Sequence, residues 1–273
     1  MDSLIYNIPA RLVGDYEGRR VIVRSHDPAE LVACSSQLEP ANVVYAQLLS
    51  LDVDVSPLTN WKQFVPLDLV MTRPVDEFSQ LYWFSHLLDK HQIRVSIPVA
   101  AGFVDAVRLS LALHFSVKLE VGQPDQDQIK ELGEILELFL HRSTVSQPVE
   151  FFHSTFLSFF HQEPASLWFI QEEDPEQIRF VSDDGVEGPS RRLNGLPFNN
   201  QTDLRPGEQE LAGEKSECDD CEFFVRCGGY FKWPNKDFSC EGVKTLFGTM
   251  RAAAAELRTD LSRIPEARGA SQR

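Results

Sequence analysis

The pattern of apolar and polar residues changes repeatedly between alternation and helical spacing across residues 42–165. Short alternating or apolar stretches predict strands at residues 51–55, 67–71, 94–100, 116–121 and 148–152. Apolar residues that recur every three or four positions predict helices at residues 74–91, 103–114 and 125–141. Strands that alternate with helices in this way pair in parallel and connect through right-handed crossovers. The sequence therefore predicts an α/β fold.

The number of repeats limits the architecture. Roughly four or five strand–helix repeats are too few to close a barrel of eight parallel strands. We expect a partial, incomplete β/α barrel over residues 42–165. A short open α/β sheet is the other arrangement that the pattern allows.

Segments with different patterns flank these repeats. Residues 1–41 are rich in β-forming residues around a turn-like centre at residues 14–18, which predicts an N-terminal β-hairpin or two short strands. Residues 167–185 predict a second hairpin, and the apolar spacing of residues 241–263 predicts a closing helix. The chain then divides into a β-rich segment (1–41), the partial barrel (42–165), a C-terminal lobe (166–263) and a disordered tail (264–273).

Composition and charge narrow the possible functions. The chain has 273 residues, of which 42% are hydrophobic and 25% charged, as in an ordinary globular protein. Its formal net charge of -15 at pH 7 argues against a nucleic-acid partner, which needs a basic surface. The sequence shows neither a secretory signal nor an apolar stretch of about 18 residues. We therefore expect a cytoplasmic protein that makes no use of the membrane.

Cysteines are concentrated in one short segment. Cys218, Cys221, Cys227 and Cys240 lie within 23 residues, and the rest of the chain contains only Cys34. A C-x2-C pair lets two sulfurs approach one metal ion or one cluster from a tight turn, and the double glycine after the third cysteine allows the backbone to pass close to a bulky group. Disulfides are rare in the cytoplasm. The four cysteines therefore predict a metal site.

This segment resembles the SPASM region of radical S-adenosylmethionine proteins that modify peptides. The resemblance implies that Cys218, Cys221, Cys227 and Cys240 bind one auxiliary 4Fe-4S cluster in a SPASM-like C-terminal lobe. The family pattern has a further cysteine at the position of Phe231, and its other ligands for a second cluster lie around a hairpin that here contains no cysteine. The resemblance thus implies a single auxiliary cluster.

The chain departs from the family at the radical-generating site. Radical S-adenosylmethionine enzymes carry a C-x3-C-x2-C loop near the start of the barrel, whereas only Cys34 precedes residue 218 here. The resemblance implies a pseudo-radical enzyme that retains the scaffold and does not generate a radical on its own. We expect a non-catalytic iron–sulfur partner in peptide (RiPP-type) or cofactor maturation. It would form a complex with a maturation enzyme and a precursor peptide, presenting the substrate, completing the active site or supplying electrons.

Two other hypotheses remain open from the residues alone. The first is a metal-dependent enzyme with a His/Asp/Glu site in the barrel cleft. Its candidate residues are His153 and His161, which flank an aromatic run at a predicted strand end, and the strand carboxylates Asp52, Asp54 and Asp68. The second is a structural zinc knuckle, because four thiolates also suit tetrahedral zinc.

Overall fold

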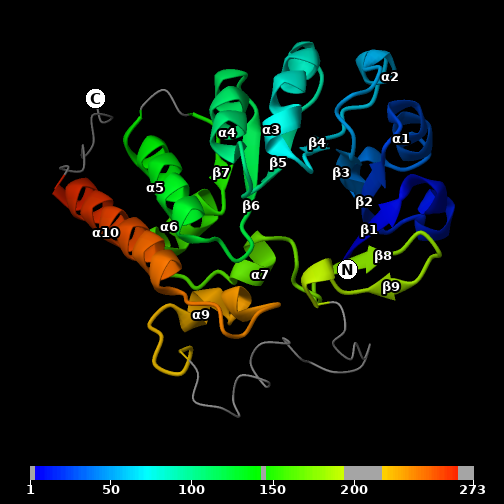
Figure 1. Cartoon of the computed structure of the whole chain (residues 1–273). Coiled ribbons are helices and arrows are strands. Elements are labelled where there is room, and N and C mark those ends of the chain that lie inside the picture. The colour runs from blue at the N-terminus through cyan, green and yellow to red at the C-terminus, as the bar shows by residue number, and fades with distance from the viewer. Residues whose placement is uncertain (1–3, 143–145, 194–216, 264–273) are drawn as a thin grey trace, which may run out of the picture.

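The computed structural model describes residues 4–142, 146–193 and 217–263. Its centre is an open nine-stranded sheet in the order β7-β6-β5-β4-β3-β2-β1-β8-β9 (Figure 1). Every neighbouring pair is parallel except β8 and β9. The strands are β1 (Ile5–Pro9), β2 (Arg20–Ser25), β3 (Val43–Leu48), β4 (Leu67–Val70), β5 (Ile93–Pro98), β6 (Ser116–Glu120), β7 (Val149–Glu150), β8 (Ile178–Val181) and β9 (Glu187–Gly188). The predicted α/β class is confirmed.

The helices between β1 and β7 lie on one side of this sheet (Figure 1). From β1 to β7, each strand lies beside the next strand in sequence, and right-handed crossovers between such neighbours all run on the same face. Figure 1 shows α1 to α5 along the outer side of the curved sheet. They are α1 (Pro28–Ser35), α2 (Ser56–Thr59), α3 (Pro74–Glu77), α4 (Phe103–Ala112) and α5 (Gln126–His141), and a 3-10 helix (Phe78–Asp89) follows α3.

The two faces of the sheet differ in chemistry. The face beneath the helices is apolar, as in the row Ala46, Leu67 and Ile93, whose members are at most 3% exposed. Burying each large aliphatic side chain contributes about 1.5–3 kcal/mol to the hydrophobic driving force. The row of Gln47, Asp68 and Arg94 lies one residue further along the strands and therefore on the opposite face. A polar face of the sheet is thus buried as well.

The C-terminal helices close one end of the molecule. The long helix α10 (Glu241–Arg263) packs against α6 (Phe152–His161) and α5. Gly242 permits the close approach to α5, because a Cβ atom there would lie 2.8 Å from Ile129. The short helices α7 (Leu167–Ile170) and α9 (Phe224–Cys227) lie near the start of α10 (Figure 1). Within the described residues, no helix combines the length and apolarity that crossing a bilayer requires.

The two short strands expected near the N-terminus are present as β1 and β2, but neither predicted hairpin forms. Strands β1 and β2 pair in parallel, because a 3-10 helix (Ala10–Tyr16) carries the chain back to the start of the sheet. The first half of the second hairpin is helix α7, since a short apolar run does not distinguish a buried helix from a strand. The second half is β8, which extends the sheet beside β1 and pairs with β9.

Most of the other predicted elements are confirmed. The strands predicted at residues 67–71, 94–100 and 116–121 correspond to β4, β5 and β6, and the predicted helices at 125–141 and 241–263 to α5 and α10. The strand predicted at residues 51–55 is wrong, because the chain has already left the sheet after β3. One sheet takes strands from the segments 1–41, 42–165 and 166–263. The predicted tail at residues 264–273 lies outside the described residues.

Candidate metal centre

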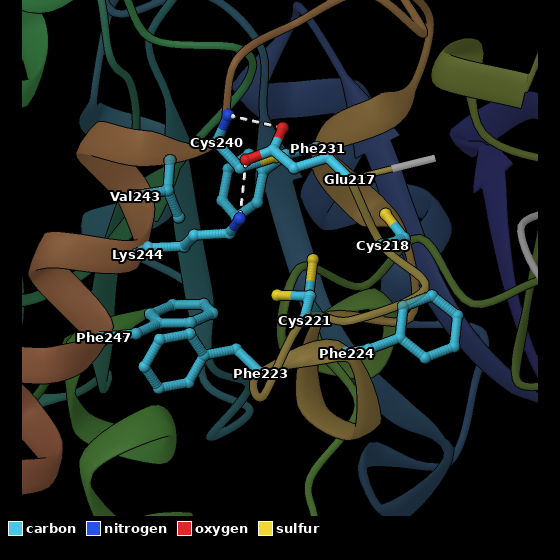
Figure 2. Close-up of a pocket in the computed structure, with 11 residues that line it drawn as sticks. Glu217, Cys218, Cys221, Phe223, Phe224, Phe231, Cys240, Val243, Lys244 and Phe247 are labelled. Atoms are coloured by element: carbon cyan, nitrogen blue, oxygen red, sulfur yellow. Dashed lines mark hydrogen bonds and ion pairs between the residues drawn. The ribbon is translucent and has the colours of Figure 1, made fainter. Parts of the chain in front are cut away.

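The four clustered cysteines meet at one pocket. Cys218, Cys221, Cys227 and Cys240 all line it, together with aromatic and aliphatic side chains from the same segment and from α10 (Figure 2). The lining atoms leave about 340 Å³ of space between them, part of which opens to solvent. Cys240 is buried, and the other three are half-buried. The fold therefore brings together the residues that the sequence selected as metal ligands.

Local backbone structure sets the directions of the first three thiols. A turn returns the chain from Cys218 to Cys221, whose N–H donates to the Cys218 carbonyl at 3.2 Å. Helix α9 then carries Cys227, and Gly228 ends this helix in the left-handed region, with φ at 55°. A Cβ atom at this position would lie 3.2 Å from Trp168, so both the conformation and the close approach require glycine.

Glu217 ties the first cysteine to the fourth. One carboxylate oxygen accepts hydrogen bonds from the Cys240 N–H at 3.3 Å and from Lys232 Nζ at 2.9 Å, and the other accepts from Lys244 Nζ at 2.6 Å. Figure 2 shows this carboxylate beside Cys240 and reaching Lys244 in the first turns of α10. The residue before Cys218 is thereby fixed to the start of the helix that follows Cys240.

Two of the four thiols, Cys227 and Cys240, resist ionisation in the metal-free protein. Burial raises the pKa of Cys227 to about 11 and that of Cys240 to about 12. A metal ion or cluster binds thiolates, so binding would release protons and weaken as the pH falls. Cys240 immediately precedes α10, where the positive end of the helix dipole favours a bound thiolate. Burial alone would raise the pKa of Glu217, but hydrogen bonds from Lys244 and Lys232 lower it to about 2.

Aromatic rings form the inner wall of the pocket. Phe223 and Phe247 have ring centroids 5.4 Å apart, and Phe231 lies 6.4 Å from Phe247. The segment is anchored to the sheet by the loop after β6, where Gln123 donates to the carbonyl of Phe231 at 2.7 Å. The indole N–H of Trp168 in α7 donates to the carbonyl of Gly228 at 3.0 Å. These contacts position the cysteines on a packed base and keep water away from their inner side.

The donor set suits a soft metal or an iron–sulfur cluster. Thiolates are the ligands of iron–sulfur clusters and of structural zinc, and four of them fill every protein position of either site. Within the described residues, no three His, Cys, Asp or Glu side chains stand close enough together to hold a single metal ion. The thiols line a shared pocket whose rear wall is apolar. The residues therefore fit the group in number and type and share one pocket, and binding would draw their sulfurs to ligating distance.

The other candidate residues lie elsewhere. His153 and His161 belong to α6, a helix and not the predicted strand end; His153 is half-buried against Phe139, and His161 is exposed. Asp52 and Asp54 are exposed in the segment before α2. Neither histidine nor either of these carboxylates lines the cysteine pocket.

Sequence reasoning missed two features. Glu217 precedes the first cysteine, and its carboxylate acts as a clamp, meaning that it holds the residue before Cys218 to the start of α10. This role depends on Lys232 and Lys244, which are 15 and 27 residues away. The buried charges on the polar face of the sheet include Asp68, which the sequence pattern grouped with exposed strand carboxylates. The available signal was a charged residue inside each of three consecutive apolar strands, Asp68 in β4, Arg94 in β5 and Lys118 in β6.

No family model matches the chain, and neither a curated protein nor a solved structure matches it. The assignment of the site therefore rests on its own geometry and donor chemistry, together with the resemblance of its cysteine spacing to the SPASM pattern.

Proposed function

We propose that the chain is a cytoplasmic iron–sulfur protein that binds one 4Fe-4S cluster through Cys218, Cys221, Cys227 and Cys240 and acts as the non-catalytic partner of a peptide- or cofactor-maturation enzyme. The observation that supports this most strongly is that all four thiols of the cysteine segment line one pocket. The cysteine spacing supports the choice of cluster, because it resembles the SPASM pattern.

The surrounding fold supports the same proposal. Consecutive parallel strands with their connecting helices on one side are wound in the direction of a β/α barrel. We infer that this sheet contains the incomplete barrel of the proposed family and that residues 166–263 include its SPASM-like lobe, with the cysteine segment and α10. Cys34, in α1, is the one further cysteine of the chain, so the chain cannot supply three thiolates for a second cluster.

The residues of the pocket define what the site would do. A cluster held by four thiolates has no open position for substrate, so it supplies electron transfer or rigidity. Phe223, Phe231 and Phe247 exclude water from its inner side, and Lys244 brings a positive charge to its outer side. Glu217 holds the two ends of the cysteine segment together before any metal binds. These features favour a pocket in which the cysteine segment is held in place before binding draws the four thiols together.

The partner role is tested by anaerobic affinity purification of the tagged chain from its native host. We expect a second polypeptide in a stable, near-stoichiometric complex, and we expect that polypeptide to contain the C-x3-C-x2-C loop that this chain lacks. The isolated chain, reduced and supplied with S-adenosylmethionine, is expected to release no deoxyadenosine. Cleavage of S-adenosylmethionine by the isolated chain would refute the non-catalytic role. Recovery of the chain alone at every salt concentration would refute the partner role.

A further inference from the structure

A cluster of buried charges lies on the face of the sheet that does not pack against α1 to α5. Asp68 in β4, Arg94 in β5 and Lys118 in β6 are each at most 8% exposed. Asp68 and Arg94 are register partners, and Lys118 is the register partner of Ser96 in β5. Parallel strands therefore place these side chains next to each other on a single face.

Asp68 is the centre of a hydrogen-bond network. Its two carboxylate oxygens accept from Arg94 Nη2 at 2.7 Å, from Ser96 Oγ at 2.8 Å and from Gln47 Nε2 at 2.9 Å. Gln47 in turn accepts from Asn7 in β1 at 3.0 Å. The guanidinium of Arg94 also lies 3.7 Å from the centre of the Tyr45 ring. The hydrogen bond to Asp68 and the contact with the Tyr45 ring together hold the guanidinium of Arg94 in one position.

Arg94 and Lys118 both contact a carboxylate from outside the sheet, that of Glu172. Glu172, two residues after α7, accepts from both terminal nitrogens of Arg94 at 2.5 and 3.1 Å and from Lys118 Nζ at 2.7 Å. Its backbone has φ at 58°, in the left-handed region that costs a residue other than glycine about 1 kcal/mol. A loop carboxylate thus occupies a fork of cationic side chains that adjacent strands supply.

Stability alone does not explain why charged side chains occupy these buried positions. Buried ion pairs seldom stabilise a fold more than apolar side chains of the same size, because desolvation cancels the attraction between the charges. Two buried donors beside the fork, Nε of Arg94 and Nε2 of Gln171, have no hydrogen-bond partner within the described part of the chain. A face of this kind, with convergent charges and unused donors, is typical of a binding site.

Solvent reaches the rim of the cluster. The Glu172 side chain keeps 23% of its exposure, although the two cations beneath it keep 7–9%. Glu120, the last residue of β6, is exposed, and the protein atoms around it still raise its pKa. The cations lie deeper along the strands than Glu120, because Arg94 is the second residue of β5 and Lys118 the third of β6. Glu172 is bonded to both of them, so a ligand that reaches Arg94 and Lys118 has to displace Glu172.

We propose that Arg94 and Lys118 form a carboxylate-binding subsite on the polar face of the sheet, and that Glu172 fills it until a ligand carboxylate takes its place. The fork of Arg94 offers two parallel N–H groups and Lys118 adds a third donor, which matches the two oxygens of a planar carboxylate. The ligand is either a free carboxylic acid or a carboxylate of a peptide. This inference is independent of the metal centre and does not rest on the proposed function.

The test vacates the subsite. Glu172→Gly removes the internal carboxylate and suits the left-handed backbone, whereas Glu176→Gly makes the same change at an exposed position of the same loop. Binding is measured by calorimetry with three probes: glutarate, a short peptide with a free C-terminus, and the same peptide amidated. We expect glutarate or the free peptide to bind Glu172→Gly at least tenfold more tightly than the wild type or Glu176→Gly. Preference for one of the two then identifies the source of the carboxylate.

Further variants separate recognition from general disruption. Lys118→Met in the Glu172→Gly background should abolish the gain, and circular dichroism establishes that each variant is folded. If Glu172→Gly does not fold, Glu172→Gln keeps the size of the side chain, removes its charge, and should show a smaller gain in affinity of the same sign. Equal affinity of Glu172→Gly and Glu176→Gly for every probe would overturn the proposal. If the amidated peptide bound Glu172→Gly as tightly as the probe with a free carboxylate that binds best, that result would overturn the proposal as well.

Discussion

Replacing Glu217 with glutamine tests the clamp that holds the cysteine segment before metal binds. Its carboxylate accepts hydrogen bonds from Lys232, Lys244 and the Cys240 N–H. Glutamine keeps the shape of the side chain, removes its charge and turns an amide group toward a lysine. Lys232 is only 5% exposed, and Glu217 is its counter-ion. In the variant Lys232 would keep its hydrogen bond to the carbonyl of Phe238, but its buried charge would no longer be paired.

The size of the effect follows from the pKa of Glu217. The difference between an ordinary pKa of 4.5 and about 2 corresponds to roughly 3 kcal/mol of stabilisation of the charged form. The side chain is 32% exposed, and solvent screening reduces the expected loss to about 1–2 kcal/mol of the free energy of unfolding. Because the folded-state pKa is depressed, this contribution is complete above about pH 4.5 and disappears as the pH falls toward about 2.

The assay is urea unfolding of the metal-free protein, followed by tryptophan fluorescence, since Trp168 packs against the same segment. Glu222→Gln is the matched control: it breaks an ion pair with Arg251 in the same segment, but its carboxylate is fully exposed, so we expect little change. The wild type and Glu217→Gln should converge in stability at low pH. A midpoint for Glu217→Gln that equals that of Glu222→Gln at pH 7 would refute the clamp.

Three further predictions concern packing and ionisation. Gly102→Ala should lower the free energy of unfolding by about 2 kcal/mol or more, because φ is 83° and the new Cβ would lie 2.6 Å from the backbone of α3. In the control Gly133→Ala, in α5, the new Cβ meets open space, and the free energy of unfolding should rise by about 0.5–1 kcal/mol. Urea unfolding midpoints distinguish the two variants. In the metal-free protein, iodoacetamide should modify Cys227 and Cys240 slowly at pH 8 and about tenfold faster per pH unit up to pH 10, as peptide mass spectrometry would measure; a rate independent of pH would contradict their raised pKa values. Two positively charged neighbours lower the pKa of Glu172 to about 2 against the effect of burial, so the wild type should lose up to roughly 3 kcal/mol of stability between about pH 4.5 and 2, and Glu172→Gln should lose less over that range in the same unfolding assay.

The sequence predicts the elements with strong periodicity and fails where local context decides. Helix α5 begins after Asp125, whose side chain accepts from the Gln128 N–H at 2.9 Å, and this capping box can be read from the residues themselves. The N-terminal segment has equally strong β-forming residues, but periodicity does not reveal which strand pairs with which. Its parallel pairing depends on a 3-10 helix that has no comparable signature.

In the candidate sites as well, the sequence predicts the residues that carry a local signature and misses those whose role depends on distant contacts. Cysteine is rare in this chain, so four cysteines in one segment mark the pocket directly. The carboxylates of Glu217 and Glu172 were not predicted, because each acquires its role from lysine or arginine side chains that only the fold brings within hydrogen-bond distance. Asp68 was selected as a possible metal ligand, and its burial next to Arg94 gives it a cation partner from the chain itself.

The most direct test of the metal centre is the iron and sulfide content of the anaerobically purified protein, measured together with its Mössbauer spectrum. We predict about four irons and four sulfides per chain for the wild type and for Cys34→Ser, with a broad absorption near 400 nm. Any single serine substitution in the quartet of Cys218, Cys221, Cys227 and Cys240 should lower this content at least severalfold. A colourless protein with one zinc per chain, or a cluster that survives all four substitutions, would contradict the proposed centre.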